Sequence, residues 1–478
     1  MISEIRISNF KSFNNIKLEL KRFNVLIGAN ASGKSNLVSI FNFLRDLVKY
    51  GLKDAISMHG GNEYIKNLNL EKNNQLKIGF SFNFLEKCNF SIQETIFNEY
   101  YFKGVENIDY DLLIDFKDNS YMILNEEINL KFKKIDFNIL SDFKLDYKRI
   151  ISLSRDYDKL VATMKNSKNV MDLEKKISDL SNIKNELDKT INEIEEITYA
   201  KTNLFIKRLN NNYLFFLEDK NKKNSIKFPY VRDLEKFKHE FKKFKITNDK
   251  CFFESGLIFQ IEPFRIIRKF LENISLYDID PKSAKNISLI TGKTELEPDG
   301  SNLVIAMKNL SEKTNEKKRF IQLLKDFLPF IEEFGTEKIA DRLFLTTLKE
   351  KYTQRSIIPA PLISDGTMNI SALIYILLFE NKPFLVFEEP ERNLHPRLVS
   401  KLISLMKDIS ERMQEKQIII TTHNPQILKY TNIENLLLIY RDEDGFSQIS
   451  IPSQNEQVKD FLKNEIGIDE LYIQNLLG

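Results

Sequence analysis

Four residue types are scarce in this sequence, and their scarcity excludes several classes of protein. The 478 residues include no tryptophan, 2 cysteines, 4 histidines and 15 glycines. Cys88 and Cys251 stand apart without a CxxC spacing, which excludes a disulfide framework or a cysteine zinc site and fits a reducing compartment. Glycine is used where the backbone turns sharply or approaches a ligand, and histidine titrates near neutrality. The few positions that hold these residues are therefore the first candidates for chemistry.

Long apolar runs and an excess of one charge are also missing. The longest apolar stretches, such as residues 371–379, are far shorter than the ~20 residues that a membrane span requires. The N-terminus carries Glu4 and no long apolar signal region, so we expect a cytoplasmic protein without a membrane partner. Lys and Arg number 71 against 68 Asp and Glu, a net charge of +3 that is too balanced to indicate nucleic-acid binding by itself.

The rest of the composition predicts a globular protein with more than one lobe. Hydrophobic residues make up 42% of the chain and charged residues 29%, which allows a sizeable core and excludes a disordered acidic chain. A single core seldom grows beyond ~250–300 residues, so we expect two or three lobes.

The first 50 residues predict two half-buried strands, a buried strand and a helix. Apolar and polar residues alternate in residues 2–7 and 16–20, a pattern typical of antiparallel strands. Residues 23–27 form a mostly apolar run that predicts a central strand, and residues 37–44 repeat apolar positions with helical spacing.

Residues 28–35, with the sequence GANASGKS, lie between the predicted central strand and the predicted helix. A phosphate chain requires backbone N–H donors around it, close approach at glycine, a lysine for the β and γ oxygens and a hydroxyl for Mg²⁺. A chance glycine turn would not be flanked by this strand and helix. We therefore predict that the loop binds ATP through Gly28, Asn30, Ser32, Gly33, Lys34, Ser35 and Asn36. Ser35 is also a predicted Mg²⁺ ligand.

The C-terminal third predicts a parallel α/β layer that ends in acidic residues. Residues 384–387 and 418–422 are β-rich runs separated by a predicted helix over residues 397–414. The first run ends in Glu388 and Glu389. We predict that Glu388 holds Mg²⁺ and that Glu389 orients or deprotonates the water that attacks the γ-phosphate. A solvated turn would explain two such acids equally well if the phosphate loop were absent.

Two further motifs are candidates for contact with phosphate. His423 follows the second β-rich run and is a predicted γ-phosphate sensor, although a histidine in this position is more often structural. Ser364, Asp365 and Gly366 precede an apolar helical run, where a small-residue turn forms either a second phosphate site or a plain helix cap.

Three other segments contribute to the predicted organisation. Residues 303–310 and 319–330 are predicted helices, and residues 442–445 are a predicted hairpin turn. Asp442 and Asp444 in that turn also form a DxD pattern that suggests a metal, but the turn explains them better.

Residues 107–216 differ in composition from the rest, because glycine disappears after Gly104 and charge increases. Apolar positions from Leu173 to Ile197 recur every three or four residues. This pattern predicts an amphipathic helix, which either forms a short coiled-coil-like hairpin or packs on a core. We expect residues 1–106 to form an N-terminal lobe, 107–216 a mostly helical insertion, 217–345 the remainder of that lobe with connecting helices, and 346–478 a C-terminal lobe.

Together these motifs resemble the RecF-like and SMC-like branch of ABC-type ATPases. In particular, they are similar to the compact bacterial AAA-domain ATPases found in DNA repair and in anti-phage defence systems such as Septu or PARIS. The opening motif of that family is similar to residues 9–13, NFKSF, and the resemblance adds Lys11 to the predicted ATP-binding residues. It makes residues 28–35 the Walker A motif, residues 364–367 the signature motif, and His423 the switch histidine.

The resemblance implies an α/β fold: an ABC/SMC-type P-loop ATPase head with a mixed sheet and a helical insertion. It also implies a head-to-tail homodimer or higher homo-oligomer, in which Ser364 and Gly366 of one subunit contact the γ-phosphate held by Lys34 of the other. Two departures are evident. Glu388 stands where Asp is commoner, and the signature reads Ser-Asp-Gly-Thr in place of the transporter-type Leu-Ser-Gly-Gly-Gln.

The implied function is a slow, partner-regulated ATPase that uses ATP and Mg²⁺ and controls a nuclease or toxin in anti-phage defence. The segment after His423 is too short for a nuclease domain, so we expect the effector to be a separate chain. A RecF-like repair ATPase that acts on DNA without an effector is the alternative, and a transporter subunit is a third class. Lysines and phenylalanines between Lys236 and Lys245 suggest either contact with DNA or the solvated face of a helix, and we favour the helix.

Overall fold

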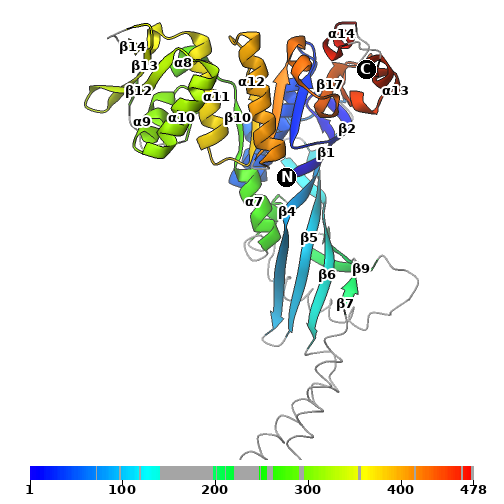
Figure 1. Ribbon diagram of the computed structural model, residues 1–478. Coiled ribbons are helices and arrows are strands. Elements are labelled where there is room, and N and C mark those ends of the chain that lie inside the picture. Colours follow the sequence, from blue (N-terminus) through cyan, green and yellow to red (C-terminus); the bar gives the residue numbers. More distant parts are fainter. Residues whose placement is uncertain are drawn as a thin grey trace, which may run out of the picture. The chain divides into compact units, whose positions relative to one another are not determined.

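The structure is a computed structural model, and it falls into two compact units (Figure 1). Unit 1 comprises residues 1–77, 116–120 and 269–478, and unit 2 comprises residues 78–115 and 121–268. The described residues are 1–70, 73–95, 98–117, 120–139, 198–200, 202–209, 212–219, 247, 249–255, 262–289, 295–353, 357–413, 416–463 and 467–474.

Unit 1 begins with the two predicted antiparallel strands. β1 (Ile2–Phe10) and β2 (Phe13–Glu19) pair with each other, with Ile5 opposite Leu18 and Ile7 opposite Ile16. These four side chains are buried, while polar residues alternate with them on the other face. The alternation read from the sequence therefore corresponds to one buried and one more exposed face.

The central sheet of unit 1 joins strands from distant parts of the chain. Its order is β10-β15-β16-β3-β17-β18, and every pairing is parallel except that of β17 with β18. The strands are β10 (Ile274–Tyr277), β15 (Phe384–Glu388), β16 (Gln417–Thr422), β3 (Phe23–Ile27), β17 (Leu436–Arg441) and β18 (Ser447–Ser450). The sheet is therefore mixed, as expected, and the carboxyl ends of β3, β15 and β16 lie at one edge.

Helices of unit 1 follow the strands at the expected places. The helix after the glycine loop is α1 (Lys34–Tyr50), and the helix between β15 and β16 is α12 (Pro396–Lys407), which continues as a π-helical turn to Arg412. Short helices follow at α2 (Leu52–Met58) and α3 (Gly61–Tyr64), and near the C-terminus at α13 (Glu456–Lys463) and α14 (Ile468–Ile473).

A second group of elements in unit 1 surrounds the signature segment. Its sheet has the order β11-β13-β12, with β14 on β13, and all of its pairings are antiparallel. The strands are β11 (Ser288–Leu289), β12 (Ile331–Ala340), β13 (Leu343–Glu350) and β14 (Ile358–Pro359), and the helices are α8 (Pro281–Ala284), α9 (Leu303–Ser311), α10 (Thr314–Phe327) and α11 (Asp365–Phe379). Figure 1 shows these helices beside β12 and β13. The two helices predicted over residues 303–310 and 319–330 are thus confirmed, and the second begins five residues earlier, at Thr314.

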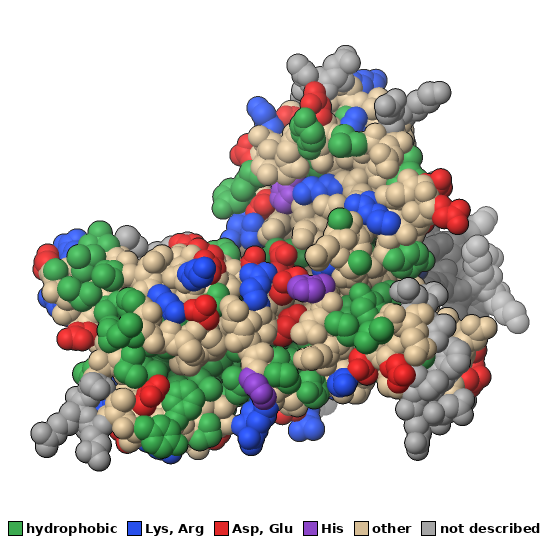
Figure 2. All heavy atoms as spheres, turned by 90° about the horizontal axis from the view of Figure 1, so that it is seen from above, with side chains coloured by type: hydrophobic (Ala, Val, Ile, Leu, Met, Phe, Trp, Pro, Cys, Tyr) green, Lys and Arg blue, Asp and Glu red, His purple; other side chains and the backbone are tan. Residues whose placement is uncertain are grey.

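Charged side chains are mixed over the surface that Figure 2 shows. Acidic and basic groups lie interspersed there, with hydrophobic side chains between them. Among the described residues, every helix is too short or too polar to span a bilayer.

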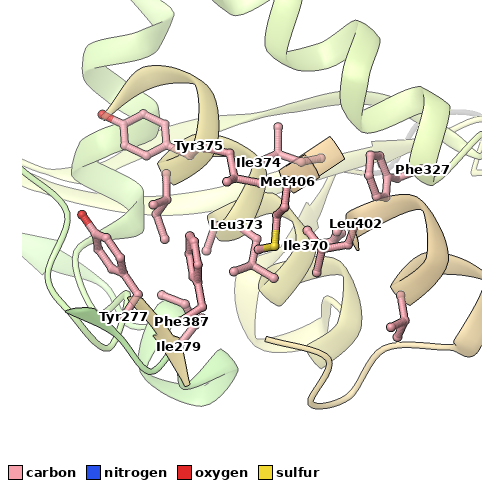
Figure 3. Packing of buried hydrophobic residues seen from close by; sticks show 14 of the residues in the cluster. Tyr277, Ile279, Phe327, Ile370, Leu373, Ile374, Tyr375, Phe387, Leu402 and Met406 are labelled. Atoms are coloured by element: carbon pink, nitrogen blue, oxygen red, sulfur yellow. The ribbon is translucent and has the colours of Figure 1, made fainter. Parts of the chain in front are cut away.

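The core of unit 1 joins the two sheets and their helices. Figure 3 shows Leu373 and Ile370 of α11 facing Leu402 and Met406 of α12, with Phe387 of β15 in the same cluster. All five side chains are at most 1% exposed. Because α11 carries the signature residues at its first turn, this packing fixes their position relative to β15.

We expect Leu373→Ala to lower the free energy of unfolding by about 2–5 kcal/mol, because the truncation leaves a cavity in a close-packed cluster. Urea unfolding measures the change. Leu362→Ala is the matched control, since Leu362 is 76% exposed and its loss is expected to change stability by less than about 0.5 kcal/mol. Equal losses in the two variants would contradict the assignment of Leu373 to the core.

Unit 2 consists largely of long strands. The sequence had predicted a mostly helical insertion for residues 107–216. Its strands lie in the order β4-β5-β6-β8-β9, with β7 beside β6. They are β4 (Gln75–Thr95), β5 (Asn98–Lys117), β6 (Ser120–Ile139), β7 (Thr198–Ala200), β8 (Thr202–Leu209) and β9 (Asn212–Asp219). The helical prediction is therefore wrong over the described parts of this range.

The burial pattern of β5 explains why these residues form strands and not helices, because buried and less buried positions alternate along it. Ile108, Tyr110, Leu112 and Ile114 are each at most 1% exposed, and more polar or more exposed residues separate them. A period of two residues specifies a strand, not a helix. The predicted amphipathic helix from Leu173 to Ile197 and the lysine-rich stretch at residues 236–245 lie outside the described residues.

A buried carboxylate ties the segment around Phe252 to the strands of unit 2. Glu126 is fully buried and accepts hydrogen bonds from the Tyr110 hydroxyl and the Phe252 amide, each at 2.7 Å. Arg208 approaches the other carboxylate oxygen at 3.6 Å and donates to the carbonyl of Lys250. Such a charge is tolerated in a core because it is paired and hydrogen-bonded.

Candidate functional site

Three neighbouring strands deliver the predicted site residues to one edge of the central sheet. β3 leads into the glycine loop, β15 ends at Glu388, and β16 ends at Thr422, directly before His423. β16 is parallel to both of the other strands, with Thr421 opposite Glu388 and Thr422 opposite Ile27. Residues nearly 400 positions apart in sequence are thereby placed side by side.

The glycine loop has positions that only glycine can occupy. A side chain at Gly28 would place its Cβ 2.3 Å from the carbonyl oxygen of Ile439. Gly33 has a φ of +116°, and its Cβ would lie 2.1 Å from the Ser447 hydroxyl. Both distances are far shorter than any van der Waals contact. Ala31 also has a positive φ, +62°, a conformation that a non-glycine residue adopts at a cost of about 1–2 kcal/mol.

A network of hydroxyl groups supports this loop, and no sequence motif indicated it. The Ser447 hydroxyl lies 2.7 Å from the Ser32 carbonyl and 2.8 Å from the Ser12 hydroxyl, which also accepts from the Asn36 amide at 2.7 Å. Arg441 donates through Nε to the Ala31 carbonyl at 3.0 Å. Ser447 and Arg441 belong to the hairpin of β17 and β18, whose turn was correctly predicted at residues 442–445.

The loop and the two acids line one cavity of about 280 Å³. Its lining residues are Asn30, Ala31, Gly33, Lys34, Ser35, Asn36, Glu388, Glu389, Thr421 and Arg441. Lys34 donates through Nζ to the carbonyl oxygens of Gly28 and Ala29, both at 2.8 Å. Burial lowers the pKa of the Lys34 ammonium, and the charges of Glu389 and Glu388 oppose this shift. The cavity thus brings basic side chains and hydroxyl-bearing residues together with two carboxylates.

The two neighbouring acids have opposite pKa shifts. Burial, followed by repulsion from Asp278 and Glu389, raises the pKa of Glu388. Burial also acts on Glu389, but hydrogen bonds from His423 and Arg392 outweigh it and hold the pKa of Glu389 below its ordinary value. A carboxylate with these donors stays ionised, whereas a buried carboxylate such as Glu388 is stabilised in its ionised form by a cation.

Glu389 is held in a fixed direction by its backbone and its partners. It has a φ of +44°, and its amide donates to the Thr421 carbonyl at 2.8 Å. Its two carboxylate oxygens lie 2.6 Å from Nδ1 of His423 and 3.2 Å from the Arg392 guanidinium. Arg392 also donates to Asp278 at 3.1 Å. The sequence pointed to Glu389 and His423, but it did not single out Arg392, which lies three residues beyond the catalytic candidate.

The segment after the acids is tied to the strand of His423 and to the signature helix. Glu391 is buried and accepts from the Thr422 hydroxyl at 2.5 Å, and burial raises the pKa of Glu391. Asn369 of α11 donates to the carbonyl of Arg392 at 2.6 Å. His395 accepts from the Arg397 amide at 3.3 Å and therefore caps α12.

The signature residues form the first turn of α11. Ser364 caps the helix by accepting from the Thr367 amide at 3.2 Å, and Lys285 donates to Asp365 at 2.5 Å. A Cβ at Gly366 would lie 2.7 Å from the Asn393 carbonyl, so the helix approaches this backbone closely. Ser364 is exposed and is not among the residues that line the cavity.

The remaining predicted ATP-binding residues take different places. Gly28 supplies a carbonyl to Lys34, and Ser32 supplies one to Ser447. Lys11 does not line the cavity, because its Nζ donates to Ser39 on α1 at 2.6 Å. His423 reaches the cavity only through its contact with Glu389.

Comparisons with known proteins give a family and a set of distant structural neighbours. The family described as "AAA domain, putative AbiEii toxin, Type IV TA system" matches residues 23–429. No curated protein matches the chain.

Several solved SMC head domains are similar in structure at low sequence identity. One is the SMC head domain with an extended coiled coil, bound to the C-terminal domain of ScpA, from Pyrococcus furiosus, with 11% identity and a TM-score of 0.41 over 97% of this chain and 99% of that one. The SMC head domain from Thermotoga maritima has 12% identity and a TM-score of 0.39 over 94% of this chain and 98% of that one. The family match spans the glycine loop, the paired acids and His423, and the chain accordingly belongs to this AAA-domain family of P-loop ATPases.

Proposed function

We propose that this chain binds Mg-ATP in the cavity beside the glycine loop and hydrolyses it. The observation that carries the proposal is the meeting of Lys34 and Ser35 with Glu388 and Glu389 around one cavity. Phosphate binding needs the lysine, the loop amides and the helix N-terminus, and hydrolysis needs a base that faces the same space.

Each residue has a separate role in this proposal. Lys34 exchanges its two carbonyl acceptors for the β and γ oxygens of ATP. The Ser35 hydroxyl and Glu388 would hold Mg²⁺, which supplies positive charge that neutralises the phosphates. Glu389 orients the attacking water and accepts its proton. His423 positions Glu389 through its hydrogen bond to the carboxylate and senses the γ-phosphate.

We propose further that two subunits pair head to tail, with Ser364 and Gly366 of each facing the γ-phosphate of the other. Two observations support this arrangement. The first turn of α11 is exposed at Ser364, where helix amides and the helix dipole favour an anion. The same residues do not line the cavity of their own chain.

Mixing two inactive variants tests the composite site. In a mixed dimer of Lys34→Ala and Ser364→Arg subunits, one site carries both changes and the other carries neither. Random mixing gives half mixed dimers with one intact site each, so about a quarter of the wild-type ATPase rate is expected to return. A mixture of Lys34→Ala with the Lys34→Ala/Ser364→Arg double variant is the control, because both of its glycine loops are altered. No recovery in the first mixture would contradict action in trans.

In the cell, we propose that this ATPase controls a separate nuclease or toxin in anti-phage defence. The family description, "AAA domain, putative AbiEii toxin, Type IV TA system", supports a link to toxin–antitoxin systems, and the separate effector is inferred from the resemblance of the sequence motifs. A RecF-like ATPase that acts on DNA without an effector is the second candidate, and the mixed charges in Figure 2 give no particular support for a DNA-binding surface on that face. Purification of the chain together with its neighbouring gene product, followed by mass measurement, distinguishes the two. A stable complex supports the effector, whereas isolation of the chain alone with binding to DNA supports the alternative.

A further inference from the structure

Arg441 lies at the end of β17, directly beside the glycine loop. It lines the cavity, where Lys34 is the other basic residue of the lining. Nε of Arg441 donates to the Ala31 carbonyl at 3.0 Å, and a terminal nitrogen of the guanidinium donates to the Gly445 carbonyl at 2.7 Å. These two bonds join the glycine loop to the turn of the hairpin of β17 and β18. The guanidinium is therefore fixed against the loop at the cavity.

The positive charge of Arg441 has no acidic partner in the part of the chain that the structure describes. Both acceptors of its guanidinium are neutral backbone carbonyls. Asp442, the next residue, instead accepts from the Phe446 amide and from the Gln448 side chain, both at 2.8 Å. Arg392, by comparison, is paired with two carboxylates. An exposed guanidinium with unused N–H donors is well suited to bind phosphate oxygens.

The strand order places Arg441 and the two acids on opposite sides of the glycine loop. β17 pairs with β3 on one side, and β16 followed by β15 lies on the other side. Glu388 and Glu389 at the end of β15 face the proposed Mg²⁺ and γ-phosphate. Because the three phosphates of ATP form a linear chain, a cation on the opposite side of the loop faces the α- and β-phosphates.

The charges of the cavity lining favour the same role. Lys34 and Arg441 are its basic residues, and Glu388 and Glu389 are its acidic residues. Mg-ATP is itself an anion, and without Arg441 the lining would present more acidic than basic groups to it. The guanidinium thus offsets repulsion that the two acids would otherwise cause.

We propose that Arg441 binds the α- and β-phosphates of the nucleotide, through the guanidinium N–H donors that the Ala31 and Gly445 carbonyls leave unused. This inference rests on the proposed ATP binding and adds to it a second cation, which ATP and ADP contact alike. The bonds to the two carbonyls hold the guanidinium in place before the nucleotide binds, and this preorganisation reduces the entropy cost of the contact.

The affinities of the Arg441→Met variant for Mg-ATP and Mg-ADP test the assignment. We expect both to weaken by about tenfold, because a hydrogen bond to a charged group is lost. The variant is expected to fold, since the Arg441 side chain is exposed. Arg412→Met is the matched control and should change neither affinity, since it removes the same charge from a side chain that is 81% exposed and does not line the cavity. Unchanged affinity of Arg441→Met for Mg-ADP would overturn the assignment.

The salt dependence of the affinity separates contact with phosphate from mere support of the loop. Added salt screens the attraction between a guanidinium and phosphates, so affinity for Mg-ADP should fall less steeply with salt in Arg441→Met than in the wild type. Ser447→Ala removes another support of the same loop without a change of charge and should keep the wild-type dependence, as should Arg412→Met. A wild-type salt dependence in Arg441→Met would overturn the proposal and leave Arg441 with support of the loop. Failure of the proposed ATP site is distinguishable, since the wild-type protein would then bind neither nucleotide.

Discussion

The Glu389→Gln variant is expected to bind Mg-ATP with nearly wild-type affinity and to hydrolyse it about 10²–10⁴-fold more slowly. The amide is almost the same size as the carboxylate but cannot accept a proton from the attacking water. In the wild-type protein, His423 and Arg392 hold the carboxylate in place and favour its ionised form, so the side chain carries no proton before the reaction. Phosphate release under single-turnover conditions measures the effect.

The same variant should also accumulate ATP-bound dimers, because the nucleotide that joins the subunits is not consumed. Size-exclusion chromatography with Mg-ATP measures this accumulation. Glu456→Gln is the matched control, since the Glu456 side chain is 84% exposed on α13 and does not line the cavity. Full turnover in Glu389→Gln would show that another group accepts the proton, and would contradict the role of Glu389 as the general base.

The Lys34→Ala variant is expected to lose affinity for Mg-ATP by about 10²-fold or more, because a charged hydrogen-bond donor is removed from a partly buried site. Lys34 is the lysine that lines the cavity, and its Nζ is held at the loop by two carbonyl oxygens. Equilibrium dialysis with labelled ATP gives the affinity. A shift in melting temperature on addition of Mg-ATP, expected for the wild type and absent from the variant, gives an independent readout.

Lys49→Ala provides the control for Lys34→Ala, since Lys49 lies in the last turn of the same helix, α1, and is exposed. Its loss removes one positive charge from the molecule without altering the cavity. Equal affinity losses in the two variants would mean that the affinity for Mg-ATP depends only on the net charge of the protein. That result would contradict the assigned site.

The parts of the site that were predictable from the sequence are the motifs that lie directly next to a strand in the sequence. The loop at residues 28–35, the acids at the end of β15 and the histidine after β16 each mark the carboxyl end of a recognisable strand. The physics of parallel sheets then places their carboxyl ends at one edge, so proximity in space could be inferred without knowledge of the strand order.

Other parts were not predictable because they depend on contacts across the whole chain. The Ser447 hydroxyl donates to the Ser32 carbonyl, 415 positions away in the sequence. The residues next to Ser447 in the sequence do not mark it as a partner of the glycine loop. Lys11 was expected among the phosphate contacts, and only the structure shows that its ammonium is bound to Ser39.

The misreading of unit 2 has a different origin. The amphipathic pattern from Leu173 to Ile197 was extended to the whole of residues 107–216, although the alternation from Ile108 to Ile114 already specified a strand. The compositional boundary marked residues 107–216 as distinct, whereas unit 2 comprises residues 78–115 and 121–268. Composition also does not determine the period of the hydrophobic residues.

The order of strands in the central sheet has a consequence for synthesis of the protein on the ribosome. β3, which leads into the glycine loop, pairs on its two sides with β16 and β17, and both are translated about 400 residues later. Until they emerge, the nascent chain carries an apolar strand with two open edges, a form of structure that is prone to wrong pairing. The glycine loop also lacks Ser447 during this interval. A nascent chain therefore completes the support of the glycine loop only after residue 447 has been translated, so copies that stop before this residue are expected to be inactive.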